Sequence, residues 1–514
     1  MNENTHTLNS EQERLFKILV NDKQDDWKTY SKRTNIKVWK GIVEKYPETA
    51  HFIYELIQNA DDTAATNVRI LLFRDKLVFK HNGKRQFSIT DAREQTGEIG
   101  DINSITSVGC STKEDEEQTI GKFGVGFKSV FQYTDTPSIY DDTFWFKIEN
   151  YIIPTLLEND HELRNAGETL FELPFKDPEK AYQEILQRLQ NLNMPVLFLP
   201  HIQKITWCID GEETIHEYSK EVIQTGERHG IKYESCRIHE YDKNLLMYLF
   251  HRDCNTIKGK YNISVGFYVN PDGSLDIDAK GQIYCFFPTS EHFDSCFVSH
   301  APFLLVDNRD SIKRYEDINQ KFLNCIAELA SDALLCLKEI GECRNSRLLE
   351  SEDNEISTTN KNILINDNIF HILNIKSTEY KDSYLRQCYF RIVRDNKLLL
   401  NRSKRYASIN DVFSATIDLE NLISSSQIAQ LCQNNDRDFL YLKQYRSDFK
   451  EVEAELKIKP FDNEYLAKHI SNSFMANQPL EWAHRLLTYI EDKARVLWRS
   501  DEPRIISDTW SAFS

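Results

Sequence analysis

Length, composition and charge set the first limits on this chain. Its 514 residues predict three or four domains at roughly 150 residues each. The formal net charge of −17 does not favour binding along a nucleic-acid duplex, so direct nucleic-acid binding is not indicated, although the charge leaves room for a local basic patch. The start has no basic region followed by an apolar run, and no stretch of roughly eighteen apolar residues exists, so we expect neither a leader nor a membrane span. Eleven scattered cysteines without a C-x-x-C pair predict reduced thiols and a cytoplasmic location.

The first part of the chain has helical and then strand patterns. Residues 11–45 are polar and amphipathic, and a stronger helix begins at Pro47, with apolar positions at helical spacing. Two β-branched, apolar stretches, NVRILLF and KLVF, predict a pair of strands that ends in the turn HNGK. Residues 88–120 are polar, charged and rich in glycine, which predicts a mobile loop.

The remainder of the chain continues this mixture. A glycine-rich turn leads into an apolar helix after residue 126, and FWFKI, TLFELPF, YNISVGFYVN, SLDIDA and QIYCFFP have strand patterns. Residues 315–340 predict one long helix, and mostly helical patterns follow a polar linker. The fold class is therefore α/β or α+β. We expect a helical extension over 1–46, an α/β domain over 47–210, an α+β, transducer-like middle domain over 211–345, a linker over 346–362 and a mainly helical region over 363–514.

The predicted helix after Pro47 carries two polar residues that could act together. Glu55 and Asn59 are four residues apart, so a helix places them on one face. A carboxylate in this position can activate a water molecule, and an amide oxygen one turn further on can bind magnesium. The spacing is also common among surface pairs, so it has little weight alone.

Three further segments suggest a nucleotide. His81-Asn82-Gly83 ends a strand, and its glycine would let the backbone approach a flat base, although the segment alone indicates only a hairpin. The glycines at 121, 124 and 126 precede a predicted helix and could present backbone N–H groups to phosphate oxygens. Phe127 separates Gly126 from Lys128, so this is not a Walker P-loop. The strand beginning at Thr169 adds one hydroxyl group.

In this order the segments resemble the GHKL ATPases, which include the ninety-kilodalton heat-shock chaperones, gyrase B, MutL and the sensor histidine kinases. AHFIYELIQNADD, VGCSTK and IGKFGVGFKSVFQYTDTP are most similar to the sacsin-type branch, which has a chaperone-like ATP-binding domain. Many large bacterial members of that branch accompany restriction or anti-phage genes. The resemblance is tight over 40–175, looser over 282–312, and fades after about residue 345.

The resemblance implies a Bergerat-type α/β sandwich over 47–210 that binds ATP and Mg²⁺. Glu55 matches the water-activating base of the family, and Asn59 matches its magnesium-binding asparagine. Asp62 matches an acidic residue that supports the base, whereas Asp61 could be a helix-end acid with no role. Gly83 matches the glycine of the adenine turn.

The resemblance also implies a mobile ATP lid over 91–120, although a permanently disordered insertion is the alternative. Thr169 matches a threonine on the adenine side, and Arg309 could sense the γ-phosphate or simply lie in a solvated helix start. The remaining residues expected to contact the nucleotide lie in the lid and the glycine run: Ser111, Lys113, Gly121, Lys122, Phe123, Gly124, Val125, Gly126 and Phe127.

One position departs from the family pattern. Most GHKL proteins have an aspartate before the adenine-turn glycine, where it accepts a hydrogen bond from the adenine amino group. The aligned residue here is His81, followed by Asn82. A neutral imidazole nitrogen or an amide oxygen can accept that bond, but without the charge of a carboxylate. Asp91 or Asp101 could also fold back into this place.

These observations favour an ATP-driven conformational machine with slow ATP hydrolysis, in a chaperone-like or anti-phage system. The alternative is a non-hydrolytic nucleotide sensor that gates a separate effector. A histidine kinase is disfavoured because no phosphoacceptor-histidine helix pair precedes Glu55. We expect a protein partner, an effector in a C-terminal continuation of the chain, or a second copy of the chain.

Overall fold

A computed structural model describes most of the chain and divides it into two compact units. The first comprises residues 1–268, 280–293 and 297–326, and the second comprises 269–279, 294–296 and 327–514. The residues described are 8–31, 50–91, 99–107, 127–241, 243–271, 273–276, 279–306, 311–350, 380–403, 405–441 and 449–498. Within these ranges no helix is long and apolar enough to cross a membrane.

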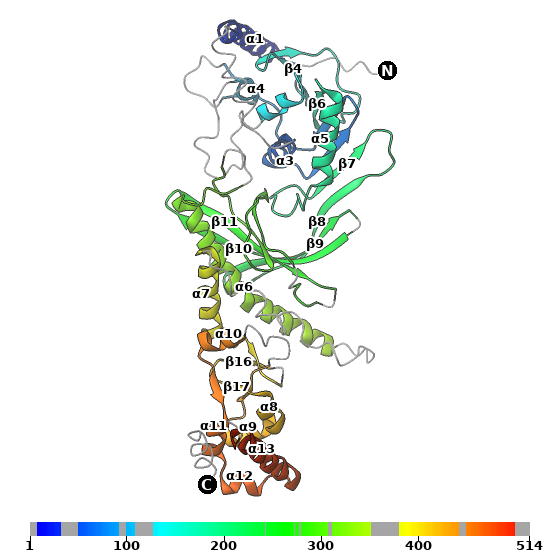
Figure 1. The fold of residues 1–514 in the computed structure, drawn as a ribbon. Coiled ribbons are helices and arrows are strands. Elements are labelled where there is room, and N and C mark those ends of the chain that lie inside the picture. Colours follow the sequence, from blue (N-terminus) through cyan, green and yellow to red (C-terminus); the bar gives the residue numbers. More distant parts are fainter. Residues whose placement is uncertain are drawn as a thin grey trace. The chain divides into compact units, whose positions relative to one another are not determined.

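A large mixed sheet forms the framework of the first unit (Figure 1). Its strand order across the described residues is β13-β12-β14-β11-β10-β9-β8-β7-β1-β2-β6-β3-β4-β5. Most neighbours are antiparallel, but β1 pairs in parallel with β7, and β12 with β14. The strands are β1 (Asn67–Leu72), β2 (Lys76–His81), β3 (Ser138–Tyr140), β4 (Trp145–Glu149), β5 (Ile153–Leu156), β6 (Thr169–Pro174), β7 (Lys204–Ile209), β8 (His216–Arg228), β9 (Ile231–Glu240), β10 (Lys243–Thr256), β11 (Gly259–Val269), β12 (Gln282–Cys285), β13 (Phe287–Pro288) and β14 (Phe297–His300).

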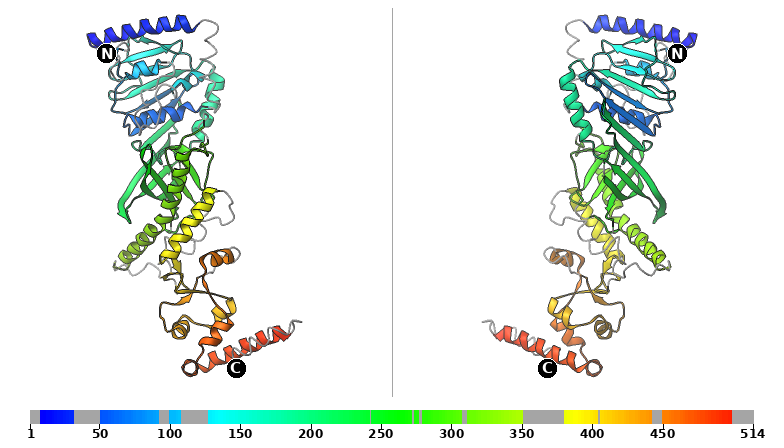
Figure 2. Two further views of the ribbon diagram at one scale, coloured as in Figure 1. Left: turned by 90° about the vertical axis from the view of Figure 1, so that its left-hand side faces the viewer. Right: turned by 90° about the vertical axis from the view of Figure 1, so that its right-hand side faces the viewer.

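Helices cover one face of the sheet around β1, β2 and β6. One apolar core joins residues of α1, α3, η1 and α5 to the strands, and α1 lies across one end of this region (Figure 2). A smaller cluster of Val78, Tyr140, Trp145 and Leu170 lies apart from that core, because alternate strand residues point to opposite faces. The helical elements are α1 (Ser10–Tyr30), α3 (Phe52–Asp62), α4 (Asp101–Ile105), η1 (Phe127–Gln132), α5 (Pro178–Gln190) and the start of α6 (Asp317–Glu350).

Helix α3 is held firmly at its C-terminal end. Ala64 takes a left-handed conformation, with φ of 58°, and the Ala65 N–H donates to the Ala60 carbonyl at 3.1 Å. Such a bond satisfies a carbonyl that the end of a helix leaves without a partner. The buried carboxylate of Asp61 accepts from the backbone N–H groups of His201 and Ile202 at 2.9 and 2.8 Å. These contacts fix the end of α3 against the segment that leads into β7.

The second unit contains helices and two small sheets. Its core includes Phe413, Ile428, Phe439, Phe461 and Trp482. Strand β17 (Val412–Ala415) pairs in parallel with β18 (Asp438–Phe439) and β19 (Lys459–Phe461), and β15 (Leu399–Leu400) pairs with β16 (Tyr406–Ala407). The helices beyond α6 are α7 (Tyr380–Asp395), α8 (Ile417–Leu422), α9 (Ser425–Cys432), α10 (Phe449–Leu456), α11 (Asn463–His469), α12 (Asn472–Ala476) and α13 (Leu480–Trp498).

The structure confirms a mixed α/β fold and corrects two local expectations. The helix expected after the glycine run is a 3₁₀ helix, η1. The prediction of a mobile loop over 88–120 is wrong for residues 99–107, because helix α4 forms there and Ile102 and Ile105 are buried. These two isoleucines pack into the core and hold the segment in place, which the charged residues around them in the sequence could not do. The other lid residues, 92–98 and 108–120, lie outside the described residues, and the expected domain boundaries stay predictions.

Removing the Asp61 carboxylate should destabilise the first unit. Asp61→Ala leaves the buried N–H of Ile202 and the partly buried N–H of His201 without an acceptor, and we expect a loss of about 2–3 kcal/mol in the free energy of unfolding. Urea-induced unfolding measures this loss. Asp75→Ala, at an exposed position between β1 and β2, is the control and should change stability by less than about 0.5 kcal/mol. Equal midpoints for Asp61→Ala and the parent chain would contradict this role.

Candidate functional site

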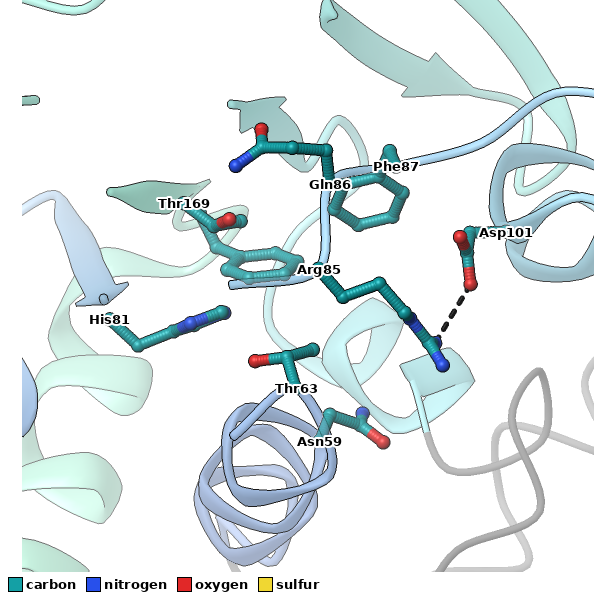
Figure 3. Close-up of a pocket in the computed structure, with 9 residues that line it drawn as sticks. Asn59, Thr63, His81, Arg85, Gln86, Phe87, Asp101 and Thr169 are labelled. Carbon is teal, nitrogen blue, oxygen red and sulfur yellow. Dashed lines mark hydrogen bonds and ion pairs between the residues drawn. The ribbon is translucent and has the colours of Figure 1, made fainter. Parts of the chain in front are cut away.

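A hollow in the first unit gathers residues from several separate segments. It encloses about 330 Å³, including open solvent at its mouth. Helix α3, strands β2 and β6, the loop after β2 and helix α4 all contribute to its wall (Figure 3). The lining residues are Asn59, Thr63, His81, Arg85, Gln86, Phe87, Asp101, Thr169 and Phe171.

Three residues expected to bind a nucleotide meet in this hollow. Asn59 comes from α3, His81 ends β2, and Thr169 begins β6. His81 and Thr169 are direct partners in the antiparallel pairing of the two strands. The Thr169 hydroxyl oxygen is buried and has no hydrogen-bond partner among the described residues. A buried hydroxyl without a partner is unfavourable, so a bound ligand that completes its hydrogen bonding would be stabilised there.

His81 is a neutral side chain with a defined tautomer. Its Nδ1 atom accepts a hydrogen bond from the Gly83 N–H at 3.0 Å, so the ring proton is on Nε2. Burial lowers the pKa of His81 to about 4, despite the nearby carboxylate of Glu168. The ring points into the hollow, with Thr169 on one side and Thr63 on the other (Figure 3). His81 therefore presents a donor to the hollow, and not the acceptor expected of it.

Gly83 is required by the packing of this turn. A Cβ atom at this position would lie 1.8 Å from the Thr63 hydroxyl oxygen and 2.8 Å from Nδ1 of His81. The Lys84 N–H also donates to the Thr63 carbonyl at 2.9 Å. The glycine thus lets the turn after β2 lie directly against the end of α3, where both elements contribute to the hollow.

The side chain of Asn82 makes its hydrogen bonds outside the hollow. Its side-chain oxygen accepts from the N–H groups of Thr66 and Asn67, both at 2.9 Å, and its amide nitrogen donates to the Thr66 hydroxyl at 2.9 Å. Asn82 does not line the hollow. Its amide therefore fixes the start of β1, and within the described residues it is not placed to accept from a base.

The mouth of the hollow contains an ion pair. Arg85 donates to one carboxylate oxygen of Asp101 at 2.9 Å, and the other oxygen accepts from the Ser88 hydroxyl at 2.7 Å (Figure 3). Both oxygens of Asp101 are thus engaged. Asp91, the alternative to Asp101 as a replacement for the adenine-binding aspartate, does not line the hollow.

Glu55 lies one helical turn before Asn59 and is buried. Its carboxylate is 3.9 Å from Nε2 of His51, whose side chain is also buried. Glu55 is not among the residues that line the hollow, and Asp62 is half-buried and does not line it either. The structure therefore places Glu55 and Asn59 on one helix but brings only Asn59 to the wall of the hollow.

The structure describes only some of the residues that were expected near the phosphates. Phe127 is buried, and its ring lies 6.0 Å from that of Phe171, so it packs behind the wall of the hollow. Lys128 donates to the carbonyls of Ile105 and Tyr151 at 2.5 and 3.1 Å, which joins α4 to η1. The remaining expected residues lie outside the described ranges: Ser111, Lys113, Gly121, Lys122, Phe123, Gly124, Val125, Gly126 and Arg309.

Five residues of the wall were not predicted, whereas Asp101 had been considered as a replacement for the adenine-binding aspartate. Two had a signal in the sequence: Thr63 follows Asn59 by one helical turn, and Phe171 follows Thr169 by two strand positions. The other three, Arg85, Gln86 and Phe87, lie in a loop whose course depends on distant contacts. The buried Asp141 carboxylate, for example, accepts from the Phe87 N–H at 2.6 Å.

The comparisons with known proteins agree with part of the resemblance. Residues 33–149 match the family model of the Sacsin domain. Protein NO VEIN of Arabidopsis thaliana is 27% identical over 333 residues, which covers 57% of this chain and 11% of that protein. Sacsin of Homo sapiens is 34% identical over 116 residues, which covers 20% of this chain and 2% of sacsin. The matches support the sacsin-type branch, and the chain spans only a small part of each relative.

One solved structure was also similar, described as the crystal structure of the N-terminal domain of a DNA repair protein. The alignment covers 55% of this chain and 95% of that chain, with 12% identity and a TM-score of 0.30. A likeness of this size carries no argument about fold or function.

A methyl group at Gly83 should separate the turn from α3. Because its Cβ would contact the Thr63 hydroxyl, Gly83→Ala should destabilise the protein by about 1–3 kcal/mol. Thr63→Ala removes the closest of these contacts, so Gly83→Ala should have a smaller effect in that background. A double-mutant cycle of unfolding free energies measures the coupling. Additive effects of the two substitutions would contradict this contact.

The buried neutral state of His81 should give a pH-dependent stability. Because the pKa of His81 is about 4 in the folded chain and about 6.5 when unfolded, protonation favours unfolding as the pH falls through this range. Between pH 7 and pH 5 the free energy of unfolding of the parent chain should fall by about 2 kcal/mol more than that of His81→Gln. Urea unfolding at both pH values measures this difference. His229→Gln, at an exposed site, should follow the parent, and parallel behaviour of His81→Gln would refute the assignment.

Proposed function

We propose that the first unit binds ATP with Mg²⁺ in the hollow, within a Bergerat-type ATPase domain of the GHKL kind. The observation that carries the proposal is the meeting of Asn59, His81 and Thr169 in one hollow. These residues come from three separated segments. From the resemblance, Asn59 was expected to bind magnesium, and His81 and Thr169 were expected on the adenine side of the same ligand. The Sacsin-domain match over 33–149 supports the proposal for the segment that contains α3, β2 and α4.

The residues present suit the two ends of such a ligand. The inner end of the hollow has the aromatic rings of Phe87 and Phe171, with centroids 6.3 Å apart, which provide apolar contact for a flat base. The Thr169 hydroxyl without a partner suits a base edge. On α3, the amide oxygen of Asn59 is a hard ligand of the type that magnesium prefers, and the ion would neutralise phosphate charge there.

Hydrolysis would be assigned to Glu55. Its carboxylate is one turn from Asn59, so a water near the phosphates could lie within its reach. In this proposal, closure over ATP and reopening after hydrolysis would drive a partner, an effector in a continuation of the chain, or a second copy of the chain. A role in a chaperone-like or anti-phage system rests on the resemblance alone.

A non-hydrolytic sensor is the second candidate. The observation that favours it is the position of Glu55, which is buried and is not on the wall of the hollow. Binding of ATP without steady phosphate release by the parent chain would decide for the sensor.

Two substitutions on α3 should separate binding from turnover. Asn59→Ala should weaken Mg-ATP binding at least tenfold, because it removes the proposed magnesium ligand. Glu55→Ala should retain binding and lower phosphate release by about a hundredfold or more, because a base acts on water and not on the nucleotide. Calorimetry with a non-hydrolysable ATP analogue and a steady-state phosphate assay measure the two effects.

Glu179→Ala is the matched control, because it removes an exposed carboxylate on α5, and it should change neither quantity. Unchanged binding in Asn59→Ala would count against the proposed magnesium site. Parallel loss of binding and turnover in Glu55→Ala would assign Glu55 a structural role.

A further inference from the structure

We propose that Arg85 binds the phosphates of the nucleotide, and that it does so by exchanging its ion pair with Asp101 for phosphate oxygens. This inference rests on the proposed function, because it concerns the ligand of the same hollow. Arg85 was not among the residues expected to contact a nucleotide. The inference therefore adds a phosphate-binding residue from the loop after β2, beside the glycine run that was expected to bind the phosphates.

The first step is the charge of the wall. Among the described residues that line the hollow, only Arg85 and Asp101 are charged near neutral pH, because burial keeps His81 neutral. A triphosphate has several negative charges, and one Mg²⁺ ion neutralises only part of them. In a chain with a formal net charge of −17, a local cation is needed to make the hollow favourable for such a ligand. Arg85 is the described residue of the wall that can supply it.

The second step is the position of the Arg85 side chain. It extends toward the side of the hollow where Asn59 and Asp101 lie, whereas His81 and Thr169 lie on the other side (Figure 3). In the proposed function the base binds against His81 and Thr169, and magnesium binds to Asn59. The guanidinium group of Arg85 therefore lies at the end of the hollow that is proposed for the phosphates.

The third step is the cost of leaving Asp101. The side chain of Arg85 is 48% exposed and that of Asp101 is 20% exposed, and an ion pair open to solvent adds little to stability. One carboxylate oxygen of Asp101 accepts from Arg85, whereas the other accepts from the backbone N–H and the hydroxyl of Ser88, at 3.1 and 2.7 Å. When Arg85 moves to a ligand, Asp101 keeps both bonds to Ser88, and the start of α4 keeps its contact with the loop.

The gain from a phosphate is larger than this cost. A guanidinium group can donate two parallel hydrogen bonds to phosphate oxygens, and such charge-assisted bonds are stronger than those between neutral groups. The carboxylate of Asp101 therefore competes with the phosphates for Arg85. This competition predicts that removing Arg85 and removing the charge of Asp101 have opposite effects on nucleotide affinity.

The first test compares a ligand that has phosphates with one that has none. Calorimetry on the full chain measures the affinities of a non-hydrolysable ATP analogue with Mg²⁺ and of adenosine. Arg85→Gln should weaken binding of the analogue by about tenfold or more, and that of adenosine by less than about twofold. Lys84→Gln is the matched control, because it removes an exposed positive charge from the same turn but outside the wall, and it should change neither affinity.

The second test measures the exchange itself and needs only the ATP analogue. Asp101→Asn removes the charge that competes for Arg85, so the analogue should bind about threefold more tightly or better. In the Arg85→Gln background the same substitution should have little effect, because its benefit depends on Arg85. This double-mutant cycle separates the exchange from a general effect of charge near the ligand. An equal gain in both backgrounds would overturn the exchange.

The remaining outcomes are also decisive. If Arg85→Gln binds the ATP analogue as well as the parent chain does, the inference fails while the proposed function stands. If Arg85→Gln weakens the analogue and adenosine equally, Arg85 shapes the hollow and does not bind phosphate, and the inference fails again. If the parent chain does not bind the analogue at all, the proposed function itself fails, and the inference fails with it.

Discussion

The register between β2 and β6 is the constraint on which the rest of the site depends. It places His81 opposite Thr169 at the inner end of the hollow, and it brings Phe171 to the same wall. A shift of one residue would turn these side chains to the other face of the sheet. Both strands are largely buried on both faces. Such a shift would exchange residues of the helix-covered core, such as Phe79 and Phe171, with residues of the smaller cluster, such as Val78 and Leu170, and would disrupt the packing of both. The apolar core of the sheet therefore fixes the position of polar groups that contribute little to stability themselves.

The sequence predicted the elements that carry strong local signals. The apolar spacing of α3, the β-branched residues of β1 and β2, and the long helix α6 were recognisable because each pattern has a period of its own. The motif order also indicated that Asn59, His81 and Thr169 belong to one site. A resemblance could connect these segments although Asn59 and Thr169 are 110 residues apart, because the order of motifs is retained in the sequence even when the contacts between them are not visible.

The rest of the site depends on contacts that no local pattern records. The polar composition around α4 predicted a loop, but Ile102 and Ile105 reach a core built by distant strands. Asn82 seemed equivalent to His81 as a partner for a base, yet its amide is used by Thr66 and Asn67. The tautomer of His81 follows from one backbone N–H group two residues away, and such a bond is a property of the folded turn. Arg85 lines the hollow because its loop is fixed from elsewhere.

We propose that the base of ATP binds in the hollow between α3, β2 and β6. A crystal structure of the chain with Mg²⁺ and a non-hydrolysable ATP analogue tests it most directly. We predict that the base lies between Phe87 and Thr63, with an acceptor atom within hydrogen-bond distance of His81 Nε2 and a polar group against the Thr169 hydroxyl. A nucleotide bound with its base outside this hollow, or with His81 turned away from it, would contradict the account.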